Sequence, residues 1–257
     1  MYDKLYNEAE KYYMMEEYKK ALELFSESYK LKADDDCLNY IGCCYLAMEL
    51  YTSASEVFKK LIKRSPDFAR PVFNLGRVYV KQNRLQDALK CFEKAILINP
   101  SSEDGYFYIG LYYERVEDFK QASIFYEKSI SLDFEQAETH LNLGICYAKM
   151  NMYEKAIEEF DISYSQDDFS KDALFNKAML FVIMGDYIRA IEIFLYINEV
   201  EPDNIDNMID IADSYLRIND LDNASKWANK ILLKDPSNKM VNKLLKLLWV
   251  LKREKQI

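Results

Sequence analysis

Few residues of this 257-residue chain could form a catalytic or metal-binding site. There is one histidine, His140, and none of the five cysteines belongs to a Cys-x-x-Cys motif. Zinc sites need several such ligands at short, regular spacings, and Cys37 and Cys43 have no histidine near them in the sequence. We therefore predict no metal, no cofactor, and cysteines that stay reduced, as they do in the cytoplasm.

Acidic pairs are the remaining residues that could perform acid–base chemistry. Glu158 and Glu159 are adjacent in a stretch that has the pattern of an exposed helix. A catalytic site needs further groups that converge on the substrate, and neither a nucleophile with its base nor a glycine-rich phosphate loop accompanies this pair. The sequence therefore indicates a protein that is not an enzyme.

The composition predicts a folded, acidic protein. Half of the residues are hydrophobic, which excludes a disordered chain, and six Gly and five Pro are too few for a turn-rich β protein. The net charge is −9, and residues 95–225 carry 26 acidic and nine basic side chains. Because these acids repel phosphate, nucleic acid is not an expected partner, and RNA binding is the weakest hypothesis. No apolar stretch approaches the roughly 20 residues of a transmembrane segment.

Small and aromatic residues recur along the chain with a period of 34. Gly42, Gly76, Gly110 and Gly144 form one series, which Ala178 and Ala212 continue. The same spacing relates a series of alanines: Ala54, Ala88, Ala122, Ala156, Ala190 and Ala224. It also relates a series of aromatics: Tyr45, Tyr79, Tyr113, Tyr147, Phe181 and Tyr215. Such a period is the signature of stacked structural repeats.

Each repeat has the pattern of two helices joined by a short turn. Apolar residues recur at steps of three and four, as at Leu85, Ala88, Leu89 and Phe92. Between the two helical stretches lie residue types that tolerate a left-handed backbone. These turn residues are Asn83, Glu117, Asn151, Gly185 and Asn219. A small residue on each helix would let the two backbones approach closely.

This pattern resembles the tetratricopeptide repeat, in which Leu-Gly, Tyr, Ala, Phe and Pro stand at fixed offsets. Lys177, which replaces an apolar residue, and Ala228, which replaces the aromatic, depart from it. The resemblance implies one all-α domain, 1–257, built as a right-handed superhelical solenoid with a concave groove. Its repeats would be 2–34, 35–68, 69–102, 103–136, 137–170, 171–204 and 205–238, followed by a capping helix, 239–257.

The family geometry places chosen positions of each first helix on the concave face, where family members usually hold a peptide. Those positions are filled by Phe73, Asn74, Phe107, Leu111, Leu141, Asn142, Ile145, Phe175, Asn176 and Met179. The apolar members would form a floor for a partner peptide or helix. The asparagines would bind a peptide backbone, since an amide side chain both donates and accepts hydrogen bonds.

Basic residues gather beside this expected floor. Residues 59–94 carry ten basic and three acidic side chains. The concave positions include Arg70, Arg77, Lys81, Arg115 and Lys149. They could hold an acidic partner through charge-assisted hydrogen bonds; the alternative is a solvated surface with no partner.

The segment 239–257 has an apolar side that would cap the last repeat. Val241, Leu245, Leu248 and Trp249 are expected on this inner side. Leu244, Leu247, Val250 and Leu251 would then remain on the concave side, where they could contact a partner or a second copy of the chain. Residues 226–257 carry a net charge of +7, so an anionic membrane is a third option.

The sequence thus favours a cytoplasmic protein-interaction scaffold or adaptor that binds a protein or peptide partner. The alternative is a structural protein that self-assembles, as a homodimer, through its Leu-rich C-terminal helix. Deletion of that helix would separate the two hypotheses, because it would abolish self-assembly and leave binding in the groove unchanged.

Overall fold

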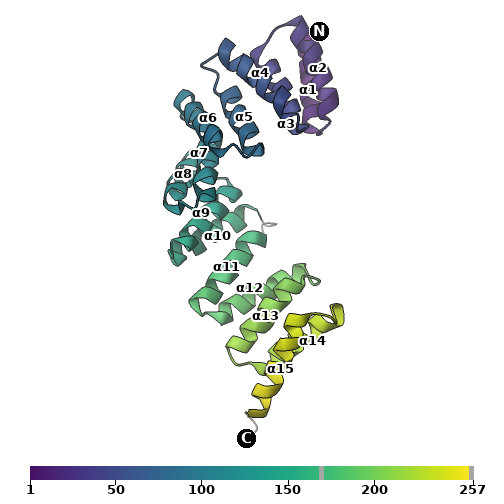
Figure 1. The fold of residues 1–257 in the computed structure, drawn as a ribbon, viewed down its shortest axis with the longest axis vertical. Helices are drawn as coiled ribbons and strands as arrows, with labels where there is room; N and C mark the ends of the chain where they lie inside the picture. Colours follow the sequence, from purple (N-terminus) through teal and green to yellow (C-terminus); the bar gives the residue numbers. More distant parts are fainter. Residues whose placement is uncertain (168–170, 255–257) are drawn as a thin grey trace. The chain divides into compact units, whose positions relative to one another are not determined.

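A computed structural model describes residues 1–167 and 171–254, and these ranges contain fifteen α-helices and no strand (Figure 1). The all-helical fold predicted from the sequence is therefore confirmed. The helices are α1 Tyr2–Met14, α2 Tyr18–Leu31, α3 Asp35–Ala47, α4 Tyr51–Arg64, α5 Ala69–Lys81, α6 Leu85–Ile98, α7 Glu103–Arg115, α8 Phe119–Leu132, α9 Ala137–Lys149, α10 Tyr153–Gln166, α11 Lys171–Met184, α12 Tyr187–Val200, α13 Ile205–Arg217, α14 Leu221–Lys234 and α15 Lys239–Glu254.

The turns inside the helix pairs have the backbone expected from their residue types. Positive φ angles, between 58° and 77°, occur at Asn83, Glu117, Asn151, Gly185 and Asn219. Glu16 and Glu49 occupy the equivalent positions of the first two pairs, each with a φ of 61°. The left-handed turn predicted at five positions is therefore confirmed, and the first two helix pairs share it.

The small residue on each first helix makes room for an aromatic ring on its partner. A Cβ atom added to Gly110 would lie 2.5 Å from Cε1 of Tyr126 in the second helix of the same pair. A Cβ atom on Gly144 would lie 2.6 Å from Cε1 of Phe160. These distances are well below van der Waals contact, so the close approach of the two helices depends on the missing side chain.

The chain divides into two compact units, Met1–Phe134 and Glu135–Ile257, and each is described separately. In the first unit the core contains buried aromatic rings from the second helices, such as Phe25, Phe58 and Phe92. In the second unit the core contains Phe194 of the second helix α12 and Ile211 of the first helix α13, among other buried side chains. The division into seven repeats of a single array stays a prediction.

Helix α15 differs from the sequence prediction at three residues. Val241 and Leu248 are buried and Leu245 packs against the core, as expected, but Trp249 is 57% exposed. Leu244 and Leu251, expected on an open surface, pack against the core instead. The physical reason is the helical period, because residues three or four apart share one side of the helix. Leu247 and Val250 remain exposed.

Candidate functional site

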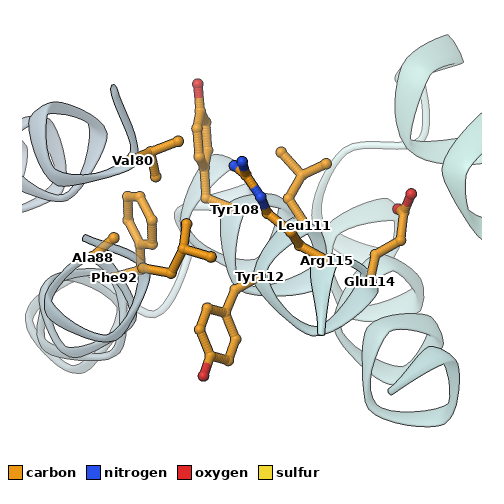
Figure 2. A pocket seen from close by; sticks show the side chains of 9 residues that line it. Val80, Ala88, Phe92, Tyr108, Leu111, Tyr112, Glu114 and Arg115 are labelled. Carbon is orange, nitrogen blue, oxygen red and sulfur yellow. The ribbon is translucent and has the colours of Figure 1, made fainter. Parts of the chain in front are cut away.

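The first unit contains two adjoining cavities that first and second helices line together. One, of about 330 Å³, is lined by side chains of α5, α6 and α7 (Figure 2). Its lining residues are Val80, Leu85, Ala88, Phe92, Tyr108, Leu111, Tyr112, Glu114 and Arg115. The other, of about 360 Å³, is lined by Tyr13, Tyr18, Cys43, Leu46, Ala47, Glu49, Tyr51, Arg77, Val80, Lys81 and Tyr108. Because the cavities share Val80 and Tyr108, we treat them as one site, the tyrosine groove.

Aromatic rings pack around Tyr108, which lines both cavities. The ring of Tyr108 lies edge-on to Phe73, with centroids 5.2 Å apart, and 5.1 Å from Phe92. Phe107 contacts the same tyrosine at 5.5 Å and Tyr126 at 5.9 Å. Phe73 and Phe107 are therefore half-buried supports of the groove wall, while Tyr108 and Leu111 line the groove directly.

Three cations in the tyrosine groove lack an anionic partner. Arg77, Lys81 and Arg115 have no carboxylate oxygen within 4 Å among the described residues. The guanidinium of Arg77 is half-buried and donates one long hydrogen bond, 3.5 Å, to Oδ1 of Asn74. In Figure 2 the guanidinium of Arg115 extends toward Tyr108. The groove therefore presents three cations, beside Glu49 and Glu114, against an aromatic surface.

The cation of Arg77 acts on the titratable groups around it. Burial raises the pKa of the Cys43 thiol to about 11, with Arg77 opposing this shift, so the thiol stays neutral at pH 7. Burial and the neighbouring Glu103 raise the pKa of Asp104, and Arg77 again opposes the change. The charge of Arg77 thus acts to lower the pKa of one group on α3, Cys43, and of one on α7, Asp104.

Two residues expected to contact a partner are engaged within the protein. Nδ2 of Asn74 is buried and donates to Oδ1 of Asn39 at 3.1 Å and to Sγ of Cys43 at 3.3 Å. Its amide is therefore not open to a peptide backbone, which corrects the expectation from the sequence. Arg70 forms an ion pair with Asp36 at 2.9 Å on the surface.

The other expected floor residues belong to the second unit. Leu141, Asn142 and Ile145 are half-buried on α9. On α11, Met179 packs against the core and Nδ2 of Asn176 donates to the backbone oxygen of Asp172 at 2.8 Å. These residues and those of the first unit are not described as one surface, and a continuous floor stays a prediction.

Phe175 and Lys149 of the second unit are open to solvent. The Phe175 ring lies 5.9 Å from that of Phe194, in the second helix of the same pair, and Phe175 also lines a cavity of about 440 Å³. Lys149 is exposed at the end of α9.

An acidic face on α13 was missed by the sequence analysis. Asp206, Asp210 and Asp213 recur at steps of four and three, so they share one side of the helix. Burial, Asp206 and Asp213 together raise the pKa of Asp210 to about 6. The spacing of these acids was readable in the sequence; the burial of Asp210 was not.

Family models for the tetratricopeptide repeat match residues 36–68, 72–102, 104–136, 137–161 and 181–248, which together make up most of the chain. The chain belongs to the tetratricopeptide repeat family. A search of curated proteins finds no match. Proteins of this family are generally protein-interaction scaffolds.

Solved structures share this fold at low sequence identity. The C-terminal part of a repeat protein from Cytophaga hutchinsonii has a TM-score of 0.76 at 20% identity, covering 93% of this chain and 99% of the other. YrrB, described as having an unusual peptide-binding site, has a TM-score of 0.66 at 21% identity, covering 75% and 99%. PilF from Pseudomonas aeruginosa has a TM-score of 0.66 at 16% identity, covering 82% and 96%.

The single histidine of this tetratricopeptide repeat chain lies at a packing position. His140 is 1% exposed, and its Nδ1 lies 2.6 Å from Oε2 of Glu159 on the second helix of the same pair. Within the described residues, no group of three or more His, Cys, Asp or Glu side chains could hold a metal ion. No described helix has both the length and the apolar character needed to span a membrane.

Proposed function

We propose that this chain is a non-catalytic scaffold that binds an acidic segment of a partner protein in the tyrosine groove. The observation that carries the proposal is the half-buried guanidinium of Arg77, which has no carboxylate partner among the described residues. A partly desolvated cation gains more from an incoming carboxylate than an exposed one does. A partner with acidic side chains would supply that missing interaction.

The arrangement of the other cations supports a segment rather than a single anion. Lys81 lies one helical turn after Arg77 on α5, and Arg115 lies on α7 in the adjoining cavity. Two or three carboxylates along a peptide could therefore be bound at once. Electrostatic attraction of this kind also raises the association rate at low salt.

The aromatic surface supplies the second part of the recognition. Tyr108 and Leu111 line the first cavity, whose volume of about 330 Å³ suits a large apolar side chain. Tyrosine rings offer a wide contact area at a low cost in conformational entropy. We therefore propose a partner segment in which acidic residues flank an apolar side chain.

The remaining hypotheses have less support from the observed surfaces. Acidic side chains predominate in the second unit, so an RNA backbone would meet repulsion there. Of the four residues expected to support self-association through α15, Leu247 and Val250 are exposed, whereas Leu244 and Leu251 pack against the core and are not available for a contact. The cytoplasmic location stays a prediction.

Binding of a designed peptide would test the proposal. The probe is a capped, fluorescently labelled peptide of about eight residues, in which Glu residues flank a central Leu and a Pro prevents helix formation. The double variant Arg77→Glu/Lys81→Glu should bind it at least about tenfold more weakly, because two attractions become repulsions. Fluorescence anisotropy at low and high salt measures the change.

The matched control changes exposed cations outside the groove. Lys60→Glu with Lys120→Glu alters the net charge of the protein by the same amount, and binding should be unchanged. Circular dichroism checks that all proteins keep their helix content. Equal binding by the double variant and the native protein would refute the proposed site.

A further inference from the structure

Three positions of each first helix contact the second helix of the same pair. At the fourth position, His140 of α9 contacts Glu159 of α10. At the eighth, Gly110 of α7 lies against the ring of Tyr126 of α8. At the eleventh, the ring of Tyr113 stacks on Phe125, with centroids 5.4 Å apart. These positions therefore mark the side on which a second helix packs.

In α15, the three equivalent positions are exposed. By the 34-residue period they are Asn242, Lys246 and Trp249, and all three are open to solvent. The eleventh position is buried or half-buried in every earlier pair, whereas Trp249 is 57% exposed. The side of α15 on which a second helix would pack is therefore uncovered in the described structure.

Lys246 determines what can cover this side. The earlier first helices have only Gly or Ala at its position, where even a Cβ atom on Gly110 or Gly144 would collide with the facing aromatic ring. A long ammonium side chain excludes an apolar second helix at the same close distance. It favours a helix that places a carboxylate opposite Lys246.

The residues around Lys246 also favour a partner helix with carboxylates. Lys239 and Lys243 are exposed neighbours on this side of α15, and none of the three lysines forms an ion pair within the described ranges. The guanidinium of Arg253 lies 3.9 Å from the ring centroid of Trp249. Val250 continues the line of Lys239, Lys243 and Lys246, while Leu247 borders that line on one side and Trp249 on the other.

We propose that the uncovered face of α15 docks an acidic amphipathic helix of a partner protein, in the place that a second helix takes in each preceding pair. Charge complementarity selects the partner, since its acids would face Lys239, Lys243 and Lys246. The apolar side chains of the partner would contact Trp249 and Leu247. This interaction is separate from the peptide site of the tyrosine groove.

Two other occupants fit the same face less well. Two copies of α15 placed face to face would bring their lysine stripes together, and like charges in contact destabilise an interface. A membrane-bound helix buries an apolar face with cations at its edges, whereas here three lysines occupy the middle of the face, between Leu247 and Trp249.

Two peptides from this chain provide matched probes. Residues 153–166 and 51–64 both form 14-residue second helices, with net charges of −3 and +3. Trp249 reports on binding because the only other tryptophan, Trp227, is 8% exposed. The capped peptide 153–166 should shift the emission of the full chain to shorter wavelength and saturate, and the capped peptide 51–64 should not.

Charge reversal in the full chain tests the role of the lysine. Lys246→Glu should weaken binding of the acidic peptide at least about tenfold, while Lys120→Glu, an equal charge change on an exposed residue of α8, should leave it unchanged. Calorimetry of Trp249→Phe checks that peptide binding persists when the fluorescence signal is removed.

Three results would overturn the proposal. One is failure of the acidic peptide to bind, or equal binding of both peptides. A second is binding of the native chain to vesicles of anionic lipid, lost in Lys246→Glu, without peptide binding. The third is a concentration-dependent dimer in light scattering that Lys246→Glu abolishes, because the occupant would then be a second copy of the chain.

Discussion

One first helix from each unit shows how the outward face can differ in charge: at the ninth position of the repeat, α5 has Arg77 and α13 has Asp213. In the first unit, α5 presents Arg77 and Lys81 at the ninth and thirteenth positions of its repeat. In the second unit, α13 presents Asp206, Asp210 and Asp213 at the second, sixth and ninth positions, and its thirteenth residue, Arg217, pairs with Asp213 at 3.2 Å. The packing positions of both helices hold the same small and apolar residue types. The fold therefore constrains the packing positions and leaves the outward positions free to differ in recognition.

The two carboxyl groups Asp104 and Asp210 show what this difference does to a titrating group. Burial raises the pKa of each, and acidic neighbours add to the effect. In the first unit Arg77 opposes the rise at Asp104, while in the second unit Asp206 and Asp213 enlarge the rise at Asp210. The local charge of the face, rather than burial alone, separates the two sites.

The largest expected effect on stability concerns a feature that both units share, the contact between a small residue on the first helix and an aromatic ring on the second. Gly110→Ala in the first unit and Gly144→Ala in the second should each lower the free energy of unfolding by about 1–3 kcal/mol, because the new methyl group would overlap an aromatic ring. Urea unfolding monitored by circular dichroism measures both changes. A neutral result for either variant would mean that helix packing differs between the units.

The helix pairs could be predicted from the sequence because their signals are local and repeated. The small residue at Gly110, the aromatic at Tyr126 and the turn at Glu117 recur with the same spacing in other repeats. Each satisfies a steric requirement within about thirty residues, so the pattern could be read without knowledge of distant contacts. The exposure of Trp249 could not, because the same aromatic series is covered in every other pair.

The candidate site was predicted in its chemistry more than in its geometry. Arg77 and Lys81 were expected on the concave face, and both line the tyrosine groove. Asn74 was expected to face a peptide, but its amide bonds to Asn39 and Cys43. A sequence position specifies the side of a helix but not the rotamer, and the rotamer decides whether a polar side chain turns inward.

The second prediction concerns the pH dependence of the second unit. The pKa of Asp210 is about 6 in the folded chain and lower when unfolded, so the folded state binds the proton more tightly. Protonation of Asp210 stabilises the folded state fully below about pH 4, and this stabilisation is lost as the pH rises through about 6. Asp210→Asn should remove that loss and raise the free energy of unfolding at pH 7 by about 1 kcal/mol, after allowing for solvent screening.

Asp186 provides a control of opposite sign in the same unit. Its carboxylate accepts a hydrogen bond from the backbone of Arg189 at the start of α12 and pairs with the side chain of that arginine, which lowers its pKa. The ionised Asp186 therefore stabilises the folded state at pH values above its unfolded pKa, and this stabilisation is lost as the pH falls through its folded pKa. Asp186→Asn should therefore destabilise the protein at pH 7. Parallel pH profiles for the Asp210→Asn variant and the native chain would contradict the assignment of Asp210.

The smallest expected effect lies in the turns, where the units differ again. The left-handed positions of the first unit are Glu16, Glu49, Asn83 and Glu117, so three of the four are glutamates, whereas the second unit uses Asn151, Gly185 and Asn219. A left-handed backbone costs a residue with a Cβ atom about 1–2 kcal/mol. Glycine avoids this cost, but it raises the entropy of the unfolded chain, which cancels part of the gain in stability. Glu117→Gly should therefore stabilise the chain by about 0.5 kcal/mol.

Gly185→Ala tests the same reasoning in the opposite direction. An added Cβ atom at Gly185 would meet no atom within 4 Å, so any loss of stability comes from the backbone angle of 77° alone. We expect a loss of about 1 kcal/mol, because the left-handed backbone costs about 1–2 kcal/mol and the lower entropy of the unfolded alanine chain offsets only part of this. If Glu117→Gly destabilised the protein instead, the carboxylate of Glu117 would have to make a favourable interaction in the turn, and the two units would then differ in turn chemistry as well as in surface charge.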